Sequence, residues 1–555
     1  MRPMKFLAAV FTAMFMFANV VMAAEFPAQV KTAEGVVQGA YDDSYGIVKW
    51  LGIPYAQQAD GDNRYELPQK AQKHSQVLDC TKPAPANLQF NGKTVVGSEG
   101  VLTLDVYRPD TKEKNLPVLV FLHGGNNQTG NSLMWVGDKF AREANAVYVS
   151  VQYRLGLLGF NNLPALECGN KLADSGNYGF IDQAYALDWV KKNIARFGGD
   201  AGNVTVSGFS AGGRDVMAML ISPYFKGKFD KALSFSGGLT VADFEESRQI
   251  IARNLAPLVV ADGICDDEKA AADWLLGSGD NVKSYLMGIS GERLVSVMAG
   301  ALIRMKSFPH LYGDGNLLPK EGFATEKFNS VPLLMLASSD EFTSFLARDV
   351  YFKNRLDKVM TDPQTKAEFV FANKYGSKFY GYFNGQESAE DIYAHYKAPM
   401  YVCKFNFGHN PAIVGEEYAI KTGAIHGIFL PFLTDQPYPY TKNTDVFTKP
   451  GPQELSRIFI ASIAAFMRTG NPNNALLPEQ WQAWTPENHA EIVFDANLEH
   501  ADVYLNHDTT TYGGIVAELE ADNSVDAATK DYIIKNVLNG RWFSAGLDAK
   551  YQNQN

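Results

Sequence analysis

Several common signatures of nucleotide and metal chemistry are absent from this sequence. It contains no GxxxxGK[ST] phosphate loop, no CxxC pair and no HExxH helix. Those motifs mark the usual nucleotide-binding and zinc sites. Acyl chemistry performed directly by side chains is still possible without these motifs. We therefore expect no metal and no organic cofactor.

Positive charge is in short supply. Lys and Arg number 50 against 61 Asp and Glu, so the formal net charge is -11 at pH 7. A chain with this field repels phosphate backbones and anionic membrane surfaces. Nucleic acid is therefore not an expected partner.

Cysteine is scarce as well, with four residues in a chain of 555. Cys80, Cys168, Cys265 and Cys403 allow three complete pairings, among which the sequence cannot choose. One candidate pair joins Cys80 and Cys168. The alternative to disulfide pairing is that the cysteines are buried free thiols, because a domain of this size does not need disulfide bonds to be stable.

The chain also lacks internal repeats, low-complexity tracts and a Pro/Gly/Ser-rich linker. With 46% hydrophobic and 20% charged residues, its composition is that of a globular chain. We therefore expect one large catalytic domain over residues 24–555, and the sequence does not indicate its oligomeric state.

The N-terminus carries a targeting signal. Two basic residues precede an apolar run over residues 6–21, which closes on the small residues of Val21-Met22-Ala23-Ala24. This pattern predicts a secretory signal peptide over residues 1–23. The alternative is a membrane anchor, but two polar residues interrupt the run. No later segment could span a bilayer, so we expect an exported protein, periplasmic or secreted.

Apolar runs of strand length recur along the chain, spaced widely enough to leave room for crossover helices. Such spacing predicts an α/β fold with a mostly parallel sheet. Between two of the runs, residues 180–197 repeat apolar side chains every three or four positions and end at Gly198-Gly199, as an amphipathic helix would. The runs are Val118 to Leu122, Val147 to Val151, Val204 to Val206 and Val331 to Leu336.

A nucleophile motif follows that helix. Residues 203–213 read NVTVSGFSAGG, a short β-branched strand followed by GxSxG around Ser210. Such a motif places the serine on a sharp strand-to-helix turn, where small residues must flank it to avoid the neighbouring backbone. Ser210 is therefore the candidate nucleophile.

The block DQAYALDWVKKNIARFGGDAGNVTVSGFSAG resembles the segment that precedes the nucleophile in type-B carboxylesterases and cholinesterases. The resemblance covers almost the whole mature chain and is nearest to the bacterial para-nitrobenzyl-esterase type. It implies an α/β-hydrolase fold, with helices on both faces of a mostly parallel sheet and long insertions, acting on small-molecule carboxylic esters. Further matching stretches are GIPYA (52–56), LTLDVYRP (102–109), VQYRLGLLGF (151–160) and FMRTGNPN (466–473).

The resemblance also assigns the partners of the serine. A serine hydroxyl needs a base to take its proton and a carboxylate to orient that base, and in this fold the chain order is Ser, acid, His. Glu341, after the apolar run VPLLMLASSDEF, matches the acid position; the alternative is the adjacent Asp340. His426, in GAIHGIFLPF, matches the base.

The resemblance implies an oxyanion hole in the stretch VFLHGGNNQTG. Its donors would be the N–H groups of Gly125 and Asn126, together with that of Ala211; the alternative is a tight turn only. Asn126 stands where relatives have a third glycine, but Asn tolerates a left-handed backbone. Phe209 replaces the glutamate of cholinesterases, which argues against a cationic choline substrate. Gly100 replaces a cysteine, so the N-terminal disulfide of many relatives cannot form.

Together these features predict a serine esterase that forms an acyl-enzyme on Ser210. Two alternatives stay open. One is a lipase-like hydrolase of longer acyl chains. The other is a non-catalytic, cholinesterase-like interaction module, since a fold does not by itself guarantee an activity.

Overall fold

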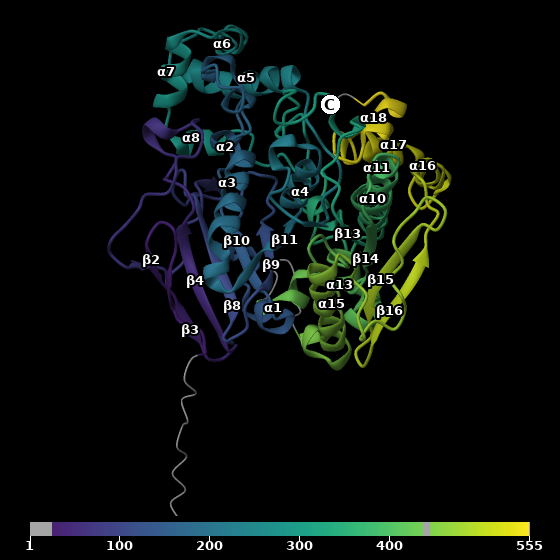
Figure 1. The fold of residues 1–555 in the computed structure, drawn as a ribbon. Helices are drawn as coiled ribbons and strands as arrows, with labels where there is room; N and C mark the ends of the chain where they lie inside the picture. Colours follow the sequence, from purple (N-terminus) through teal and green to yellow (C-terminus); the bar gives the residue numbers. More distant parts are fainter. Residues whose placement is uncertain (1–24, 437–444, 554–555) are drawn as a thin grey trace, which may run out of the picture.

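The computed structural model describes residues 25–436 and 445–553, so the predicted signal peptide over residues 1–23 lies outside the described residues. A sheet of 11 strands runs through the molecule in the order β16-β15-β14-β13-β12-β11-β9-β10-β8-β4-β3 (Figure 1). Its strands are β3 (Ala40–Asp42), β4 (Ile47–Pro54), β8 (Thr103–Pro109), β9 (Leu116–Leu122), β10 (Val147–Val151), β11 (Gly199–Phe209), β12 (Lys231–Phe235), β13 (Leu333–Ser338), β14 (Met400–Phe405), β15 (Ala490–Ala496) and β16 (Ala501–His507).

The centre of the sheet is parallel. From β10 through β9, β11, β12, β13 and β14 to β15, every neighbouring pair runs in the same direction. The pairs beyond this block are antiparallel. The prediction of a mostly parallel sheet is therefore confirmed.

Three of the four apolar runs form strands within two residues of their predicted bounds. The strand β10 has the bounds that the sequence predicts, and β9 begins two residues before its run. The strand β11 is much longer than Val204 to Val206, because its pairing with β12 continues as far as Phe209. Every residue of β9, β10, β12 and β13 is buried. Burial on both faces explains the apolar runs in β9, β10 and β13.

Helices cover both faces of the sheet. Along β9, Val118, Val120 and Leu122 point into one core, while Leu119 and Phe121 point into another. The first core contains α3 (Tyr178–Asn193) and α4 (Ala211–Ile221), and the second contains α1 (Asp138–Ala144) and α15 (Pro450–Thr469).

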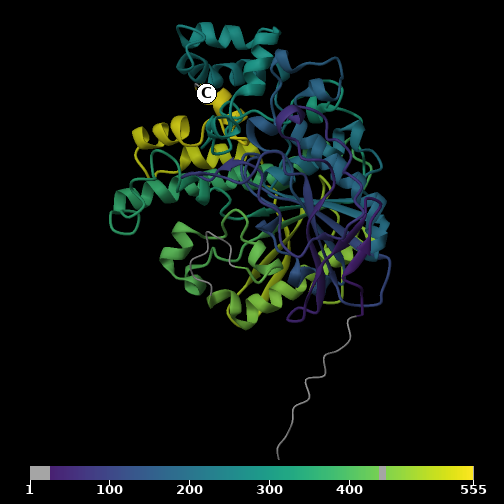
Figure 2. The same cartoon turned by 90° about the vertical axis from the view of Figure 1, so that its left-hand side faces the viewer.

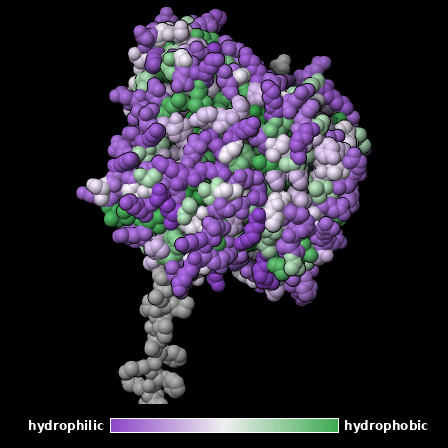
Figure 3. All heavy atoms as spheres, in the orientation of Figure 1, coloured by the Kyte–Doolittle hydropathy of each residue, from purple (hydrophilic) through white to green (hydrophobic). Residues whose placement is uncertain are grey.

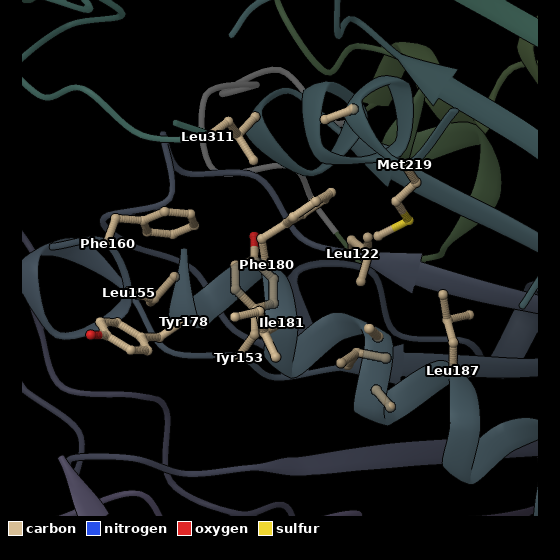
Figure 4. Packing of buried hydrophobic residues seen from close by; sticks show 14 of the residues in the cluster. Leu122, Tyr153, Leu155, Phe160, Tyr178, Phe180, Ile181, Leu187, Met219 and Leu311 are labelled. Carbon is tan, nitrogen blue, oxygen red and sulfur yellow. The ribbon is translucent and has the colours of Figure 1, made fainter. Parts of the chain in front are cut away.

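The helix α3 ends as the sequence predicts but is buried more deeply. Its last turn continues as a 3₁₀ turn to Phe197 and stops at Gly198, whose φ is 79°. The predicted apolar positions over residues 180–197 are all buried, and the exposed residues recur on the opposite side, so the amphipathic pattern is confirmed; within α3 itself only Asp188 and Lys192 are exposed. Figure 4 shows the reason: side chains of α3 pack among those of other elements, including Leu122 of β9 and Met219 of α4.

Two further groups of helices lie outside the sheet (Figures 1 and 2). One contains α5 (Phe244–Ala261), α6 (Glu268–Leu275), α7 (Asp280–Gly288) and α8 (Gly291–Ser296). The other packs α10 (Pro363–Tyr382) against the C-terminal helices α16 (Tyr512–Ala521), α17 (Ala527–Asn536) and α18 (Ala545–Tyr551) around a third core.

The surface seen in Figure 3 is mostly hydrophilic, with hydrophobic residues scattered over it. Among the described residues, no helix has the length and hydrophobicity needed to cross a bilayer.

All four cysteines are free thiols, so the candidate pair of Cys80 with Cys168 was wrong. Cys80 is buried, and its backbone is fixed by hydrogen bonds to Gln38 and Leu51, whereas Cys168 is exposed. Burial raises the pKa of the Cys80 thiol to about 12, which keeps it protonated and unreactive.

Candidate functional site

Ser210 sits on the turn between β11 and α4, in a conformation that few residues adopt. Its φ is 58° and its ψ is -116°. The serine N–H donates to the carbonyl oxygen of Phe235 (2.8 Å), and the N–H of Arg214 donates to the serine carbonyl (2.9 Å). Such a conformation costs about 1 to 3 kcal/mol and persists only where the surroundings enforce it.

Glycines allow this turn to form. A Cβ atom on Gly208 would lie 2.1 Å from the carbonyl oxygen of Gly212, and one on Gly212 would lie 2.2 Å from the carbonyl oxygen of Leu122. Both contacts are with backbone atoms, which cannot move aside as a flexible side chain would. The requirement for small residues two positions either side of the serine thus follows from backbone packing.

Glu341 and His426 form a buried pair close to the turn. The Oε2 atom of Glu341 is hydrogen-bonded to Nδ1 of His426. Its Oε1 atom accepts hydrogen bonds from the Ser236 hydroxyl (2.5 Å) and from the Ser338 N–H (2.7 Å). Glu341 has no exposed surface. Because each oxygen is occupied, the carboxylate has one fixed orientation, and it fixes the imidazole ring.

Asp340 faces different partners. Its Oδ2 atom accepts hydrogen bonds from the Ala424 N–H (2.9 Å) and from His409 Nδ1 (2.9 Å), and its own N–H donates to the Ala424 carbonyl (2.9 Å). The hydrogen bond from His409 to this carboxylate raises the pKa of His409. Asp340 therefore ties the end of β13 to the loop that carries His426, and the structure brings Glu341 to the imidazole instead.

Aromatic rings enclose His426. The centroid of its ring lies 4.7 Å from that of Phe209, 5.2 Å from that of Phe345 and 5.6 Å from that of Tyr380, which stacks on it. The imidazole is 5% exposed, as is Ser210. Sequence reasoning did not identify Ser236, Phe345 or Tyr380, and no local motif marks them.

The glycine-rich loop after β9 lies against the turn. A Cβ atom on Gly124 would be 2.8 Å from the Phe209 carbonyl oxygen and 3.0 Å from Ser210 Cβ. The φ of Gly125 is 109° and that of Asn126 is 59°, so Asn126 does adopt the left-handed backbone that asparagine tolerates. In the described part of the chain, the N–H groups of Gly125 and Asn126 donate to no backbone acceptor.

Ala211 completes this group of donors. It is the first residue of α4, where backbone N–H groups have no partner inside the helix and carry the positive end of its dipole. The loop that carries Gly125 and Asn126 thus lies against the turn where Ala211 follows Ser210.

A buried polar network holds the loop in place. The Asn127 amide donates to Asp215 Oδ1 (2.8 Å), the Gln183 amide donates to Asp215 Oδ2 (2.6 Å), and the Tyr153 hydroxyl donates to Asn127 Oδ1 (3.0 Å). Burial raises the pKa of Asp215 to about 6. The network ties the loop to α3 and α4, and sequence reasoning missed it because its members are far apart in the chain.

A surface cleft of about 840 Å³ borders the segments that carry Glu341 and His426. Among its lining residues are Ser344, Arg348, Phe369, Tyr418 and Ile425. Within the described ranges, no group of three or more His, Cys, Asp and Glu side chains is placed to hold a metal ion.

The helix α10 runs into a π-helical turn, η8 (Phe383–Glu387), beside the site. Glu387 ends this turn, and its Oε2 atom has no hydrogen-bond partner among the described residues. Burial, with the nearby charges of Asp391 and Glu390, raises the pKa of Glu387 to about 7. Its carboxyl group therefore stabilises the fold most below about pH 4 and loses that contribution as the pH rises through 7.

The substitution Glu387→Gln replaces this ionisable carboxyl group with a neutral amide. We expect the free energy of unfolding to rise by roughly 2 to 3 kcal/mol at about pH 8 and to change little at about pH 4.5. Urea unfolding followed by circular dichroism at both pH values measures the difference. Glu499→Gln, at a carboxylate 84% exposed, is the control. An equal effect of Glu387→Gln at both pH values would contradict the prediction.

Comparisons with known proteins point to one family. A model of the Carboxylesterase family matches residues 27–397. The para-nitrobenzyl esterase of Bacillus subtilis (strain 168) is 28% identical over 491 residues, covering 84% of this chain and 95% of that protein. The liver carboxylesterase of Sus scrofa is 30% identical over 532 residues, covering 83% of this chain and 88% of that protein.

Solved structures agree with the sequence matches. A PNB esterase superposes with a TM-score of 0.68 and 26% identity, covering 88% of this chain and 100% of that chain. A carboxylesterase of Geobacillus stearothermophilus superposes with a TM-score of 0.67 and 25% identity, covering 88% and 99% of the two chains.

Proposed function

The chain belongs to the carboxylesterase family, and we propose that this carboxylic ester hydrolase works through an acyl-enzyme on Ser210, with His426 as base and Glu341 as orienting acid. The likeness to solved esterases confirms the α/β-hydrolase fold expected from the sequence. The substrates are small-molecule carboxylic esters.

The reaction proceeds in two halves. His426 takes the proton of the Ser210 hydroxyl, the oxygen attacks the ester carbonyl, and the protonated imidazole then gives its proton to the leaving alcohol. Water, activated by the same imidazole, releases the acid. Glu341 holds the imidazole in the tautomer that presents Nε2 to the serine.

Backbone donors stabilise the negative oxygen of each tetrahedral intermediate. The N–H groups of Gly125, Asn126 and Ala211 serve as these donors. A single donor of this kind typically contributes about a hundred- to a thousandfold in rate. Among the described residues, no backbone acceptor is hydrogen-bonded to the Asn126 N–H, which supports this role.

The buried pair of Glu341 and His426 beside the strained turn at Ser210 is the observation that carries this proposal. An interaction module would gain nothing from the cost of this conformation. We also propose that residues 1–23 direct export to the periplasm or the medium and that residues 24–555 form one catalytic domain. The family match, which begins at residue 27, supports that division.

Covalent labelling tests the proposal directly. A fluorophosphonate reacts with an activated serine, so we expect one adduct, on Ser210, when the purified mature protein is labelled and mapped by mass spectrometry. Turnover of short p-nitrophenyl esters should stop as the adduct forms. Absence of an adduct on any serine, with no ester cleaved, would favour the interaction module instead.

A further inference from the structure

Four buried polar side chains beside Ser210 have no role in the chemistry above. Within residues 25–436 and 445–553, no hydrogen-bond partner is present for Arg214 Nε, the Tyr380 hydroxyl, either amide atom of Asn384 or Trp542 Nε1. Arg214, Tyr380 and Asn384 have no exposed surface, and Trp542 is 7% exposed. Native proteins rarely leave buried polar atoms unpaired, because each one costs about 1 to 3 kcal/mol.

These side chains come from three segments and meet in one place. The Arg214 guanidinium, one turn along α4 from Ser210, lies 3.7 Å from the centre of the Trp542 ring. The Tyr380 ring is 6.1 Å from that of Trp542, and Asn384 follows Tyr380 by one turn. Burial and the nearby charge of Glu341 raise the pKa of Tyr380, and the approach of Asn384 and Ser210 to its hydroxyl offsets part of that rise. The cluster therefore adjoins the nucleophile.

Arg214 is a buried charge without a counter-ion in contact. No carboxylate of the described residues forms an ion pair with it; its guanidinium donates to His310 Nε2 (2.8 Å) and Met305 Sδ (3.5 Å). Burial lowers the pKa of Arg214 to about 10, so it is still a cation at neutral pH. Burial and the guanidinium lower the pKa of His310, so its imidazole is neutral.

The acidic residue next to Arg214 in the chain forms no ion pair with it. Asp215 follows Arg214 directly but points toward Asn127 and Gln183, to which both of its oxygens are hydrogen-bonded. A buried cation without a paired anion is costly, since burial removes its hydration. A carboxylate is the group that a guanidinium binds best, through paired hydrogen bonds in one plane.

Resting on the proposed function, we propose that Arg214, with Tyr380, Asn384 and Trp542, binds a carboxylate on the acyl part of the substrate. The preferred substrates are then half-esters of dicarboxylic acids. The proposal places the acyl part at this cluster because Arg214 lies one turn beyond the serine that becomes acylated. The leaving oxygen faces His426, which must give it a proton. The rings of Phe209 and Phe345 pack against that imidazole, and so does the ring of Tyr380, whose hydroxyl also approaches Asn384.

Two esters of one acid test the proposal on the mature full-length chain. Monomethyl adipate carries the free carboxylate, and dimethyl adipate is its neutral counterpart. We expect kcat/KM to favour monomethyl adipate by about 10- to 100-fold, as hydrogen bonds to a charged group would provide. Arg214→Leu should bring this ratio close to one, and Arg214→Lys, which keeps the charge without the planar fork, should restore part of it.

Arg108→Leu is the matched control. Arg108 is also fully buried and lies 3.7 Å from the centre of a ring, that of Phe26, but it donates to backbone carbonyls on the other side of the fold. It should lower stability and leave the ratio at the wild-type value. A ratio is unaffected by the fraction of folded enzyme, so partial unfolding of a variant does not obscure the result.

The wild type alone also decides the question, even if Arg214→Leu does not fold. Adipate should then inhibit hydrolysis of p-nitrophenyl acetate competitively, and adipamide, its neutral counterpart, should inhibit much more weakly. A wild type that cleaves monomethyl adipate no better than dimethyl adipate overturns the proposal while leaving the esterase mechanism intact. Loss of the mechanism would appear separately, as a failure of Ser210 to take the fluorophosphonate label.

Discussion

Ser210→Ala is expected to lower kcat for ester hydrolysis by about 10⁵- to 10⁶-fold. Alanine has no oxygen to form the acyl-enzyme, so the reaction must pass through direct attack by water. The residual rate comes from substrate binding and from the backbone donors around the serine, which the substitution leaves in place. Initial rates with p-nitrophenyl acetate, measured at high enzyme concentration, cover the range needed.

A serine on β11, the strand that leads to the nucleophile, provides the control. Ser207 is buried three residues before the nucleophile, and its hydroxyl donates to the Val120 carbonyl (3.0 Å). Ser207→Ala should retain most of the activity and all of the labelling at Ser210. If Ser210→Ala kept more than about one hundredth of the wild-type kcat, another nucleophile would have to be sought.

Glu341→Gln is expected to lower kcat by about 10⁴-fold, with little change in the fold. The glutamine amide can donate a hydrogen bond to Nδ1 of His426, which would leave the proton on Nε2 and block its action as a base. The effect should appear in kcat rather than KM, because the imidazole acts in the transition state. Pre-steady-state kinetics with p-nitrophenyl acetate would show slow acylation.

Asp340→Asn is the matched comparison, because Asp340 was the alternative acid. It contacts His409 and the loop at Ala424. We therefore expect a lower melting temperature and a loss in kcat of about tenfold or less. A loss at Asp340 equal to that at Glu341 would contradict the assignment of the acid.

Much of the fold was readable from local sequence. Apolar runs predicted β9, β10 and β13 within two residues of their bounds, since burial on both faces favours apolar side chains throughout a strand. No run marked the central strand β12, which contains the buried polar residues Lys231 and Ser234. The end of the helix at Gly198 could also be predicted locally, because glycine adopts the required positive φ without strain. The lengths of strands were harder to predict from the sequence, because they depend on pairing with neighbouring strands. The strand β11, for example, ends where its pairing with β12 ends.

The candidate site divides in the same way. Ser210 was named from a motif that a sharp strand-to-helix turn requires, and Glu341 and His426 were named from the resemblance of two short stretches to those of the family. Ser236, Tyr380 and Arg214 were not named. Their parts in the site depend on packing between segments more than a hundred residues apart in some cases, and no local pattern encodes such distances.

By itself, the sequence determined the class of this protein: an acidic α/β chain with a serine elbow, a following acid and histidine, and no marks of metal or nucleotide chemistry. Only the tertiary structure decided that Glu341 rather than Asp340 meets the imidazole, that the four cysteines stay unpaired, and that a buried arginine lies one turn beyond the nucleophile. The physical reason is that backbone conformation responds to neighbouring residues, whereas hydrogen bonds and buried charges depend on which distant segments the fold packs together.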